Sequence, residues 1–261
     1  RRGEQRNIKG KTEMKELDWE YIDALMPRRA AESSKNDYGR ILCVCGSAGY
    51  TGAAFFAAQG AVRMGSGVVT LAVPERAWSV LAVKLSEPVV RPLPCTEDGL
   101  FSVRALPRLL ELAEHADALL IGCGLGRSDE VTEVVCTLLC EAACPIVLDA
   151  DGIFALAQGV QALVGLEEDL LRGVLGQRPI LQNDIAQEEL RAFAQENRCT
   201  VLYKAHRTLI AAPDGRLFRN HTGNPGMAKG GSGDTLAGML VSLIGQGLAP
   251  EDAACAAAWL H

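Results

Sequence analysis

The sequence has few aromatic residues, no long apolar run and little concentrated positive charge beyond its first fifteen residues. The best apolar candidate, residues 146–160, is interrupted by Asp149 and Asp151, whereas a membrane-spanning helix needs about 20 apolar residues. A nucleic-acid-binding surface needs clustered basic residues, but this chain has a formal net charge of −6. We therefore expect neither a membrane nor a nucleic acid as a partner.

The nine cysteines lack the Cys-x-x-Cys pairing of a structural zinc site, and the four histidines form no ligand set with them. Cys43 and Cys45 alternate within one apolar run, and Cys136, Cys140 and Cys144 recur at helical spacing. We expect buried, reduced thiols, which are typical of a cytoplasmic protein.

The rest of the composition is that of an ordinary globular protein, with 48% hydrophobic and 22% charged residues over 261 positions. The basic residues 1–15 are expected to form a flexible arm. No repeat, low-complexity block or linker divides residues 16–261, so we expect one domain there. Because the sequence stops at His261 within a helical pattern, we also expect the C-terminus to be truncated.

Short apolar runs alternate with amphipathic stretches of helical length from Ile41 onward. Continuous apolar strands separated by crossover helices are typical of a parallel sheet that helices cover on both faces. The expected strands lie at residues 41–46, 67–74, 116–122, 144–151, 178–181 and 199–204. The sequence therefore predicts an α/β fold with a mostly parallel central sheet.

An antiparallel hairpin is expected after this parallel series. Residues 207–212 and 216–220 flank Pro213-Asp214-Gly215, which is a turn-forming triplet. We therefore expect the hairpin at one edge of the sheet, followed by a glycine-rich segment and two more helices.

Two glycine-rich loops follow apolar strands and precede helices. Residues 46–54 read GSAGYTGAA and residues 122–130 read GCGLGRSDE. Backbone N–H groups at such helix starts can bind anions, and open α/β proteins bind ligands at this carboxyl edge of the sheet. The first loop lacks the ending of a P-loop and the spacing of a dinucleotide fingerprint, so each loop could also be a mere tight turn.

The segment GMAKGGSGDTLAG, residues 226–238, is a sharper signal. Its glycines would let a ligand approach the backbone, and the N–H groups of the following helix would form an anion pocket. Asp234 could simply stabilise the helix start, by about 0.3–1 kcal/mol. We favour a second interpretation, in which it takes a proton from a hydroxyl while the pocket holds a phosphoryl group.

Two more strand ends carry charged residues. In LDADG, Asp149 and Asp151 could hold Mg²⁺ through water or cap the next helix. In YKAHRT, Lys204 closes a strand and could be solvated, or the residues after it could wrap a nucleotide phosphate.

Together these blocks resemble the NAD(P)H-hydrate dehydratases, which are ADP- or ATP-dependent repair enzymes with a ribokinase-like fold. The resemblance rests on GSAGYTGAAFFAAQGAVRMGSGVVTLAVP, GCGLGR, VLDADG, YKAHRTLIAAPDG and NHTGNPGMAKGGSGDTLAG, and it spans residues 37–238. Its most specific part is TGNPGMA followed by GG-S-GD, since other ribokinase-like kinases share little beyond GxGD.

The resemblance implies a reaction and its site. The C6 hydroxyl of (6S)-NADHX or NADPHX would be phosphorylated at the expense of ADP or ATP, with Mg²⁺, and phosphate elimination would regenerate the nicotinamide cofactor. Asp234 would deprotonate the hydroxyl and contact the hydrate together with Ala53, Gly124 and Gly126. The positions implied for nucleotide binding are Lys204, Ala205, His206, Arg207, Thr208, Asn224, Gly230, Gly231 and Gly233. The family also suggests a homo-oligomer, commonly a tetramer, and possible fusion to an NAD(P)H-hydrate epimerase.

The sequence departs from the family pattern at three places. Ala205 replaces the glycine of a Lys-Gly-x-x-Thr loop, and Lys229 stands where the family usually has Thr. The family also places a substrate-contacting His soon after the strand at 178–181, and no such residue follows here. Either the protein has lost this segment, or a stretch between Leu181 and Gln182 is missing from the sequence, which is the interpretation we favour.

Two other functions stay open on the residues alone. A ribokinase-like kinase of a small alcohol or vitamin precursor would share GxGD and Asp234, although the TGNPGMA block argues against it. A non-catalytic nucleotide-binding module would be consistent with the missing histidine.

Overall fold

Five parallel strands form the central sheet in the computed structural model, which describes residues 14–162 and 187–261. Their order across the sheet is β4-β3-β2-β5-β6. The strands are β2 (Arg40–Val44), β3 (Val68–Pro74), β4 (Val89–Leu93), β5 (Ala118–Ile121) and β6 (Ile146–Leu148). The predicted α/β class and parallel core are therefore confirmed.

Strand β4 is a strand that the apolar pattern did not predict. Its sequence, VVRPL, contains a charged residue and a proline, both of which weaken a strand signal. Proline lacks the N–H group that a central strand would need, but β4 lies at the edge of the sheet, where this loss is tolerated.

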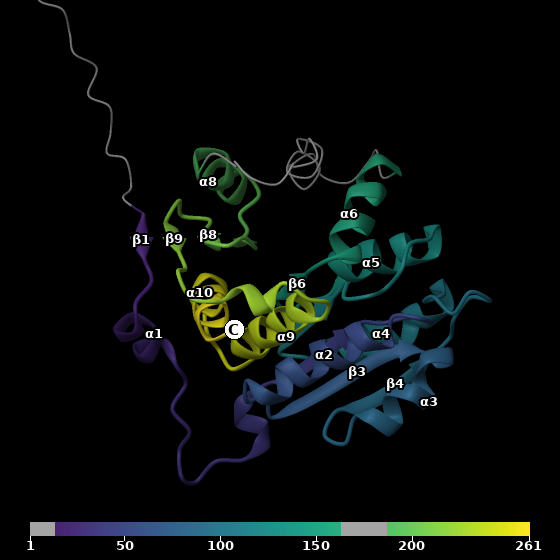
Figure 1. The fold of residues 1–261 in the computed structure, drawn as a ribbon. Coiled ribbons are helices and arrows are strands. Elements are labelled where there is room, and N and C mark those ends of the chain that lie inside the picture. Colours follow the sequence, from purple (N-terminus) through teal and green to yellow (C-terminus); the bar gives the residue numbers. More distant parts are fainter. Residues whose placement is uncertain (1–13, 163–186) are drawn as a thin grey trace, which may run out of the picture.

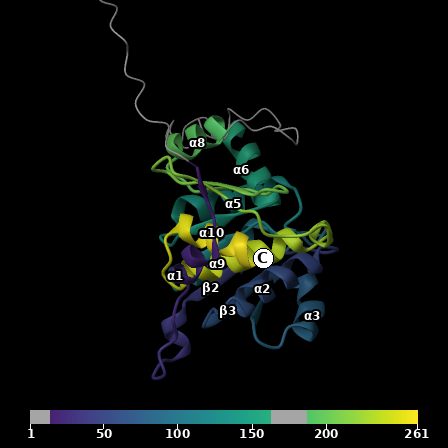
Figure 2. The ribbon, with the colours of Figure 1, turned by 60° about the vertical axis from the view of Figure 1, so that its left-hand side comes forward.

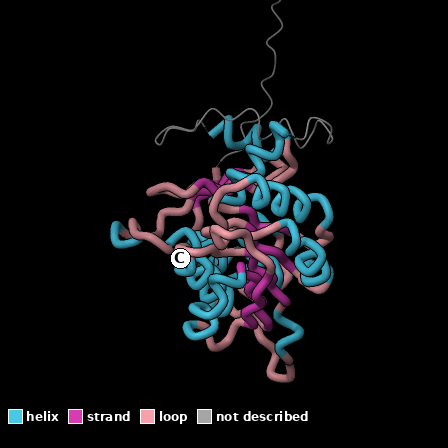
Figure 3. The backbone as a smooth tube through the Cα atoms, turned by 90° about the vertical axis from the view of Figure 1, so that its right-hand side faces the viewer, coloured by secondary structure: helices cyan, strands magenta, loops and turns pink. Residues whose placement is uncertain are grey.

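Helices cover both faces of this sheet, as Figure 3 shows. Ile41 and Cys43 of β2 point into one buried cluster with α2, α3, α9 and α10, whereas Leu42 and Val44 point into another with α4, α5 and α6. This alternation is what a strand buried on both faces requires. The helices are α2 (Thr51–Arg63), α3 (Glu75–Lys84), α4 (Leu106–Glu114), α5 (Asp129–Glu141), α6 (Asp151–Ala162), α9 (Ser232–Gly245) and α10 (Pro250–Leu260).

A second, four-stranded sheet lies above α10 in Figures 1 and 2. Its order is β1-β9-β8-β7. The strands are β1 (Lys15–Glu16), β7 (Val201–Tyr203), β8 (Leu209–Ala211) and β9 (Leu217–Arg219). Strand β8 pairs antiparallel with both β7 and β9, and β1 pairs parallel with β9. The predicted hairpin is thus confirmed as β8 and β9. Its expected place at an edge of the central sheet is wrong, because both strands lie inside this second sheet. Helix α8 (Gln187–Glu196) packs on this sheet through Leu190 and Ala194.

The position of β7 differs from the sequence-based expectation. Residues 199–204 were expected to extend the parallel series, but β7 pairs antiparallel with β8. An apolar run indicates a buried strand without indicating its partner, which here is the nearest strand in sequence. The expected strand at 178–181, and the question of the histidine after it, lie outside the described residues.

The two sheets share one buried cluster. Ile210 of β8 and Phe218 of β9 belong to the same cluster as the β2 face and α9, and so does Ile22 of α1 (Trp19–Leu25). Lys15, which was expected to belong to the arm, pairs with Phe218. This shared core favours our interpretation of one domain.

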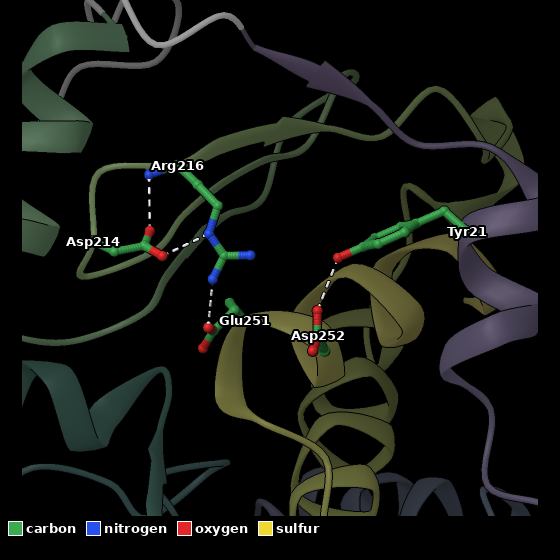
Figure 4. A network of polar contacts seen from close by, with 5 residues as sticks. All are labelled: Tyr21, Asp214, Arg216, Glu251 and Asp252. Atoms are coloured by element: carbon green, nitrogen blue, oxygen red, sulfur yellow. Dashed lines mark hydrogen bonds and ion pairs between the residues drawn. The ribbon is translucent and has the colours of Figure 1, made fainter.

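A polar network ties the hairpin turn to α10 and α1 (Figure 4). Arg216 contacts Asp214 and Glu251 at 2.6 and 2.7 Å, and Tyr21 donates a hydrogen bond of 2.8 Å to Asp252. Burial and the neighbouring Asp252 carboxylate raise the pKa of Tyr21, so its hydroxyl stays a donor.

The remaining short elements are the 3-10 helices at Lys35–Tyr38, Val103–Ala105 and Pro225–Met227. No helix in the described ranges is long and apolar enough to cross a membrane.

Candidate active site at the carboxyl edge of the sheet

Helices α2 and α9 lie side by side and parallel, so that their N-termini point to the same edge of the sheet (Figure 1). Phe56 near the start of α2 lies against Gly231 at the start of α9, and Met64 after the end of α2 contacts Gln246 after the end of α9. The close approach depends on small residues, because a Cβ on Gly238 would overlap the backbone of α2. Two helix starts, each rich in free N–H groups, therefore face the region beyond the strand ends.

Asp234 is the third residue of α9 and is half-buried. The N-cap of the helix is Gly231, which has a positive φ of 92° and makes no side-chain capping hydrogen bond. A side chain at Gly231 would also meet the Phe56 ring, 2.5 Å from an added Cβ. Glycine is therefore required at this turn, and Asp234 does not act as the N-cap.

Lys204 reaches this helix start from the end of β7. Its Nζ lies 2.6 Å from Oδ1 of Asp149, a residue that follows β6 and is 55 positions away. The same Nζ lies 3.4 Å from the place where a Cβ of Gly233 would be. The ammonium of Lys204 therefore lies over the backbone of Gly233, the residue before Asp234, while its ion pair is with Asp149.

The pKa of the Asp234 carboxyl is raised above its ordinary value of 3.8. Burial is the main cause, and the negative charges of Asp149 and Asp151 act in the same direction. A hydrogen bond from the Cys123 thiol and the positive charge of Lys204 partly oppose the shift. A half-buried carboxylate with a raised pKa is a stronger base than a solvated one, as a general base requires.

The thiols beneath Asp234 were not recognised as part of the site from the sequence. Cys123 and Cys45 are fully buried and close enough to influence each other, and burial raises the pKa of the Cys45 thiol. Both remain protonated at neutral pH, so Cys123 can donate to the Asp234 carboxylate. Only their positions after strands β2 and β5 could have indicated this, since all nine cysteines are free.

Ala53 and Gly124, two positions expected to contact the hydrate, lie together. A Cβ added to Gly124 would be 2.7 Å from the Ala53 Cβ, so the loop after β5 lies against the first turn of α2. Buried Ser47 fixes this loop by donating a hydrogen bond of 2.8 Å to the Gly124 carbonyl. Gly126 lies further along, where its N–H donates to Asp151 at 3.1 Å.

The expected nucleotide positions form two groups. After Lys204, residues Ala205, His206 and Arg207 are exposed, and Thr208 closes the turn with a hydrogen bond of 3.2 Å to the Ala205 carbonyl. Asn224 accepts a hydrogen bond from the Gly226 N–H. With Lys229, Gly230, Gly231 and the exposed Phe56 ring, Asn224 lines a pocket of about 380 Å³.

The described residues do not form a protein cage for a metal ion. Within 14–162 and 187–261, no group of three or more His, Cys, Asp or Glu side chains could hold a metal. Asp149 is engaged by Lys204, and Asp151 is engaged by the Gly126 N–H and by Arg127 at 3.3 Å. The Asp149 and Asp151 carboxylates are thus already used by positive groups and do not fit a directly bound Mg²⁺.

Comparison with known proteins identifies relatives of this chain. The family model for NAD(P)H-hydrate dehydratase matches residues 41–261. The chain is 41% identical over 244 residues to the bifunctional NAD(P)H-hydrate repair enzyme Nnr of Moorella thermoacetica, covering 90% of this chain and 46% of that protein. It is 32% identical to the ADP-dependent (S)-NAD(P)H-hydrate dehydratase of Bacillus subtilis, covering 93% of this chain and 85% of that protein. The chain thus spans about half the length of the bifunctional relatives.

Solved structures give the same picture. A ribokinase-like superfamily protein of Enterococcus faecalis matches with a TM-score of 0.78 at 25% identity, covering 97% of this chain and 87% of that one. The ADP/ATP-dependent NAD(P)H-hydrate dehydratase of B. subtilis, co-crystallised with ATP/Mg²⁺, matches with a TM-score of 0.73 at 28% identity, covering 95% and 87%. The predicted ribokinase-like fold is confirmed by these matches.

Proposed function

The chain belongs to the NAD(P)H-hydrate dehydratase family, and we propose that it uses ADP or ATP to dehydrate (6S)-NADHX and NADPHX to NADH and NADPH. The observation that carries the proposal is the raised pKa of half-buried Asp234 at a helix start, with the Lys204 ammonium over the neighbouring Gly233. A base and an anion site side by side are what phosphoryl transfer to a hydroxyl requires.

In the proposed reaction, the oxygen of the C6 hydroxyl attacks the terminal phosphorus of the nucleotide, and Asp234 takes the proton of that hydroxyl. The N–H groups of Gly233 and its neighbours, with Lys204, stabilise the charge on the transferring group. Breakage of the C6–O bond then releases phosphate, and loss of a proton from the adjacent carbon restores the ring double bond. The remaining product is AMP from ADP, or ADP from ATP.

The other site residues have roles in binding. Ala53, Gly124 and Gly126 are proposed to contact the hydrate, because Ala53 and Gly124 lie against each other at the same edge as Asp234. The nucleotide is proposed to contact the loop from Lys204 to Thr208. Asn224, Gly230 and Gly231 would contact it in the adjoining pocket.

Magnesium is proposed to enter with the nucleotide phosphates, because the Asp149 and Asp151 carboxylates are engaged by positive groups. It would neutralise charge on those phosphates.

The test is recovery of NADH absorbance at 340 nm when the purified protein is incubated with NADHX, Mg²⁺ and either ADP or ATP. Recovery should require the nucleotide and release one phosphate per NADH formed. Absence of recovery with both nucleotides would refute the proposal. Accumulation of a stable phosphorylated product without NADH would indicate a kinase instead.

The setting of the enzyme is also a proposal. The bifunctional relatives are about twice as long as this chain, which supports a role beside an NAD(P)H-hydrate epimerase, whether fused or separate. Nine free cysteines favour a reducing cytoplasm. A homo-oligomer is proposed from the resemblance, and light scattering in solution would test it.

A further inference from the structure

A single ammonium group lies near two carboxylates at the start of α9, but it is bonded to the one that is not the proposed base. Lys204 Nζ pairs with Asp149 at 2.6 Å. Its charge nevertheless lowers the pKa of Asp234, so the two groups are close enough to interact. Within the described part of the chain, the ion pair of Lys204 is the one with Asp149.

Asp149 is the fixed member of this pair. Its side chain is 14% exposed, against 44% for Lys204. Its backbone is held on both sides, because its N–H donates to the Ile121 carbonyl at 3.1 Å and its carbonyl accepts from Gly152 at 2.9 Å. A side chain on Gly122 would overlap the Asp149 carbonyl, so the strand ends of β5 and β6 pack without space between them. The carboxylate therefore determines where the flexible lysine side chain ends.

The position of the ammonium is otherwise unfavourable. The N-terminus of a helix carries a partial positive charge, so a lysine there is destabilising unless negative charge compensates it. Asp149 supplies this compensation in the unliganded protein, and the nucleotide phosphates would add to it during the reaction. The pair also joins the end of β6 in the parallel sheet to the end of β7 in the second sheet.

Loss of Asp149 would leave Lys204 a different partner. Asp234 also senses the charge of Lys204, and a direct ion pair between them would stabilise the ionised form of that carboxylate. Asp234 would then be a weaker base, and the ammonium would no longer face the phosphoryl group.

We propose that Asp149 is a positioning residue for phosphoryl transfer: it holds Lys204 over Gly233 and away from Asp234. Asp149 thereby keeps the ammonium available to the phosphoryl group and Asp234 free to accept a proton. The inference rests on the proposed function for its kinetic meaning, but the position of Lys204 can be tested without it.

The first test compares Asp149→Asn with the wild type in kinetics. We expect kcat to fall about 10- to 100-fold, as loss of a charge-assisted hydrogen bond in the reacting site implies, while KM for ADP rises no more than about threefold. In a Lys204→Met background, Asp149→Asn should change kcat less than about twofold, because a residue that acts through Lys204 has nothing left to position. Equal effects in both backgrounds would overturn the proposal.

The matched control is Asp214→Asn, which also removes an acid from a 2.6 Å ion pair, in the hairpin turn. It should leave kcat within about twofold of the wild type, since Asp214 lies outside the proposed site. A fall in kcat as large as that of Asp149→Asn would mean that both substitutions act through general stability, and would count against the proposal.

The second test is independent of activity. Crystal structures of the unliganded wild type and of Asp149→Asn should differ in Lys204, whose Nζ should move from position 149 to within hydrogen-bond distance of Asp234. An unmoved Nζ would refute the positioning role even in an active enzyme. If Nζ moves in Asp149→Asn and the wild type cannot dehydrate NADHX, the positioning role is supported and the proposed function is refuted.

Discussion

Two clusters in this protein place one basic side chain among acids, and they use it differently. In the hairpin turn, Arg216 contacts both of its acids, Asp214 and Glu251, at 2.6 and 2.7 Å (Figure 4). At the start of α9, Lys204 contacts Asp149 at 2.6 Å, and the pKa of the neighbouring Asp234 is raised. The planar guanidinium can serve two partners at once, whereas the ammonium is a compact point charge.

The contrast separates a structural network from a reactive one. In the turn, hydrogen bonds from Arg216 lower the pKa of Asp214, so ionisation and folding favour each other. At α9, burial and two neighbouring carboxylates raise the pKa of Asp234, so folding disfavours its ionised form. A protein retains such an unfavourable charge where the charge has a use, which is why perturbed carboxyls indicate functional sites.

The sharpest way to test this contrast is to remove one acid from each cluster. Asp234→Asn should lower kcat for NADHX dehydration by roughly 10²–10⁴-fold, because the amide cannot accept the proton. ADP affinity, measured by calorimetry, should stay within about threefold, since the backbone N–H groups remain. Asp214→Asn should leave both quantities near the wild-type values. A wild-type rate in Asp234→Asn would reduce this acid to a structural residue.

Each cluster also lies beside a glycine with positive φ, at 92° for Gly231 and 90° for Gly215. Alanine at either position is strained by about 1–2 kcal/mol. In addition, a Cβ at Gly231 would meet the Phe56 ring, whereas at Gly215 it would meet the flexible amide end of Gln195. Overpacking against the ring should bring the loss for Gly231→Ala to about 2–4 kcal/mol, against about 1–2 for Gly215→Ala.

Urea denaturation would measure these two losses, and calorimetry would add a second readout. Gly231→Ala should weaken ADP binding if the backbone there approaches phosphate closely, and Gly215→Ala should not. Equal losses of stability in the two variants would show that the Phe56 ring moves aside without cost.

The sequence was sufficient for the parts of the fold and site that depend on local pattern. Apolar runs predicted β2, β3, β5 and β6, and the Pro-Asp-Gly turn predicted the hairpin. The position of Asp234 in the first turn of a helix also followed from the glycine-rich segment before it. Each of these features is determined by neighbours in sequence.

The rest depended on contacts between distant segments. The Lys204–Asp149 pair joins residues 55 positions apart and requires β7 to leave the parallel series for the second sheet. The effect of the Cys123 thiol on the pKa of Asp234 requires the end of β5 to lie close to α9. Composition and spacing carry no record of either approach, so the charges around Asp234 could be found only in three dimensions.

A smaller effect is expected from breaking the structural network itself. Arg216→Met should destabilise the protein by about 0.5–1 kcal/mol, because its two ion pairs are partly solvated and water screens them. The loss should shrink at 1 M salt, where the Debye length is about 3 Å. Activity at 25 °C should be unchanged. A loss of dehydratase activity without unfolding would mean that this network reaches the site.

The smallest expected effect distinguishes the clusters by sign. Asp214 has a lowered folded pKa, so its ionised form stabilises the protein above the ordinary value of 3.8, and this contribution is lost as the pH falls through the folded pKa. The pKa of Asp234 in the folded protein is raised, so its contribution to the stability of the protein is present at low pH and is lost as the pH rises through that pKa. At pH 7, Asp214→Asn should therefore lower the free energy of unfolding, and Asp234→Asn should raise it, each by about 1 kcal/mol or less. Thermal melts of both variants from pH 7 down to pH 4 should show the Asp234→Asn difference shrinking first, because the raised pKa lies higher. Destabilisation by Asp234→Asn at pH 7 would mean that its carboxylate is as well compensated as that of Asp214, and that the first turn of α9 stores no unfavourable charge for catalysis.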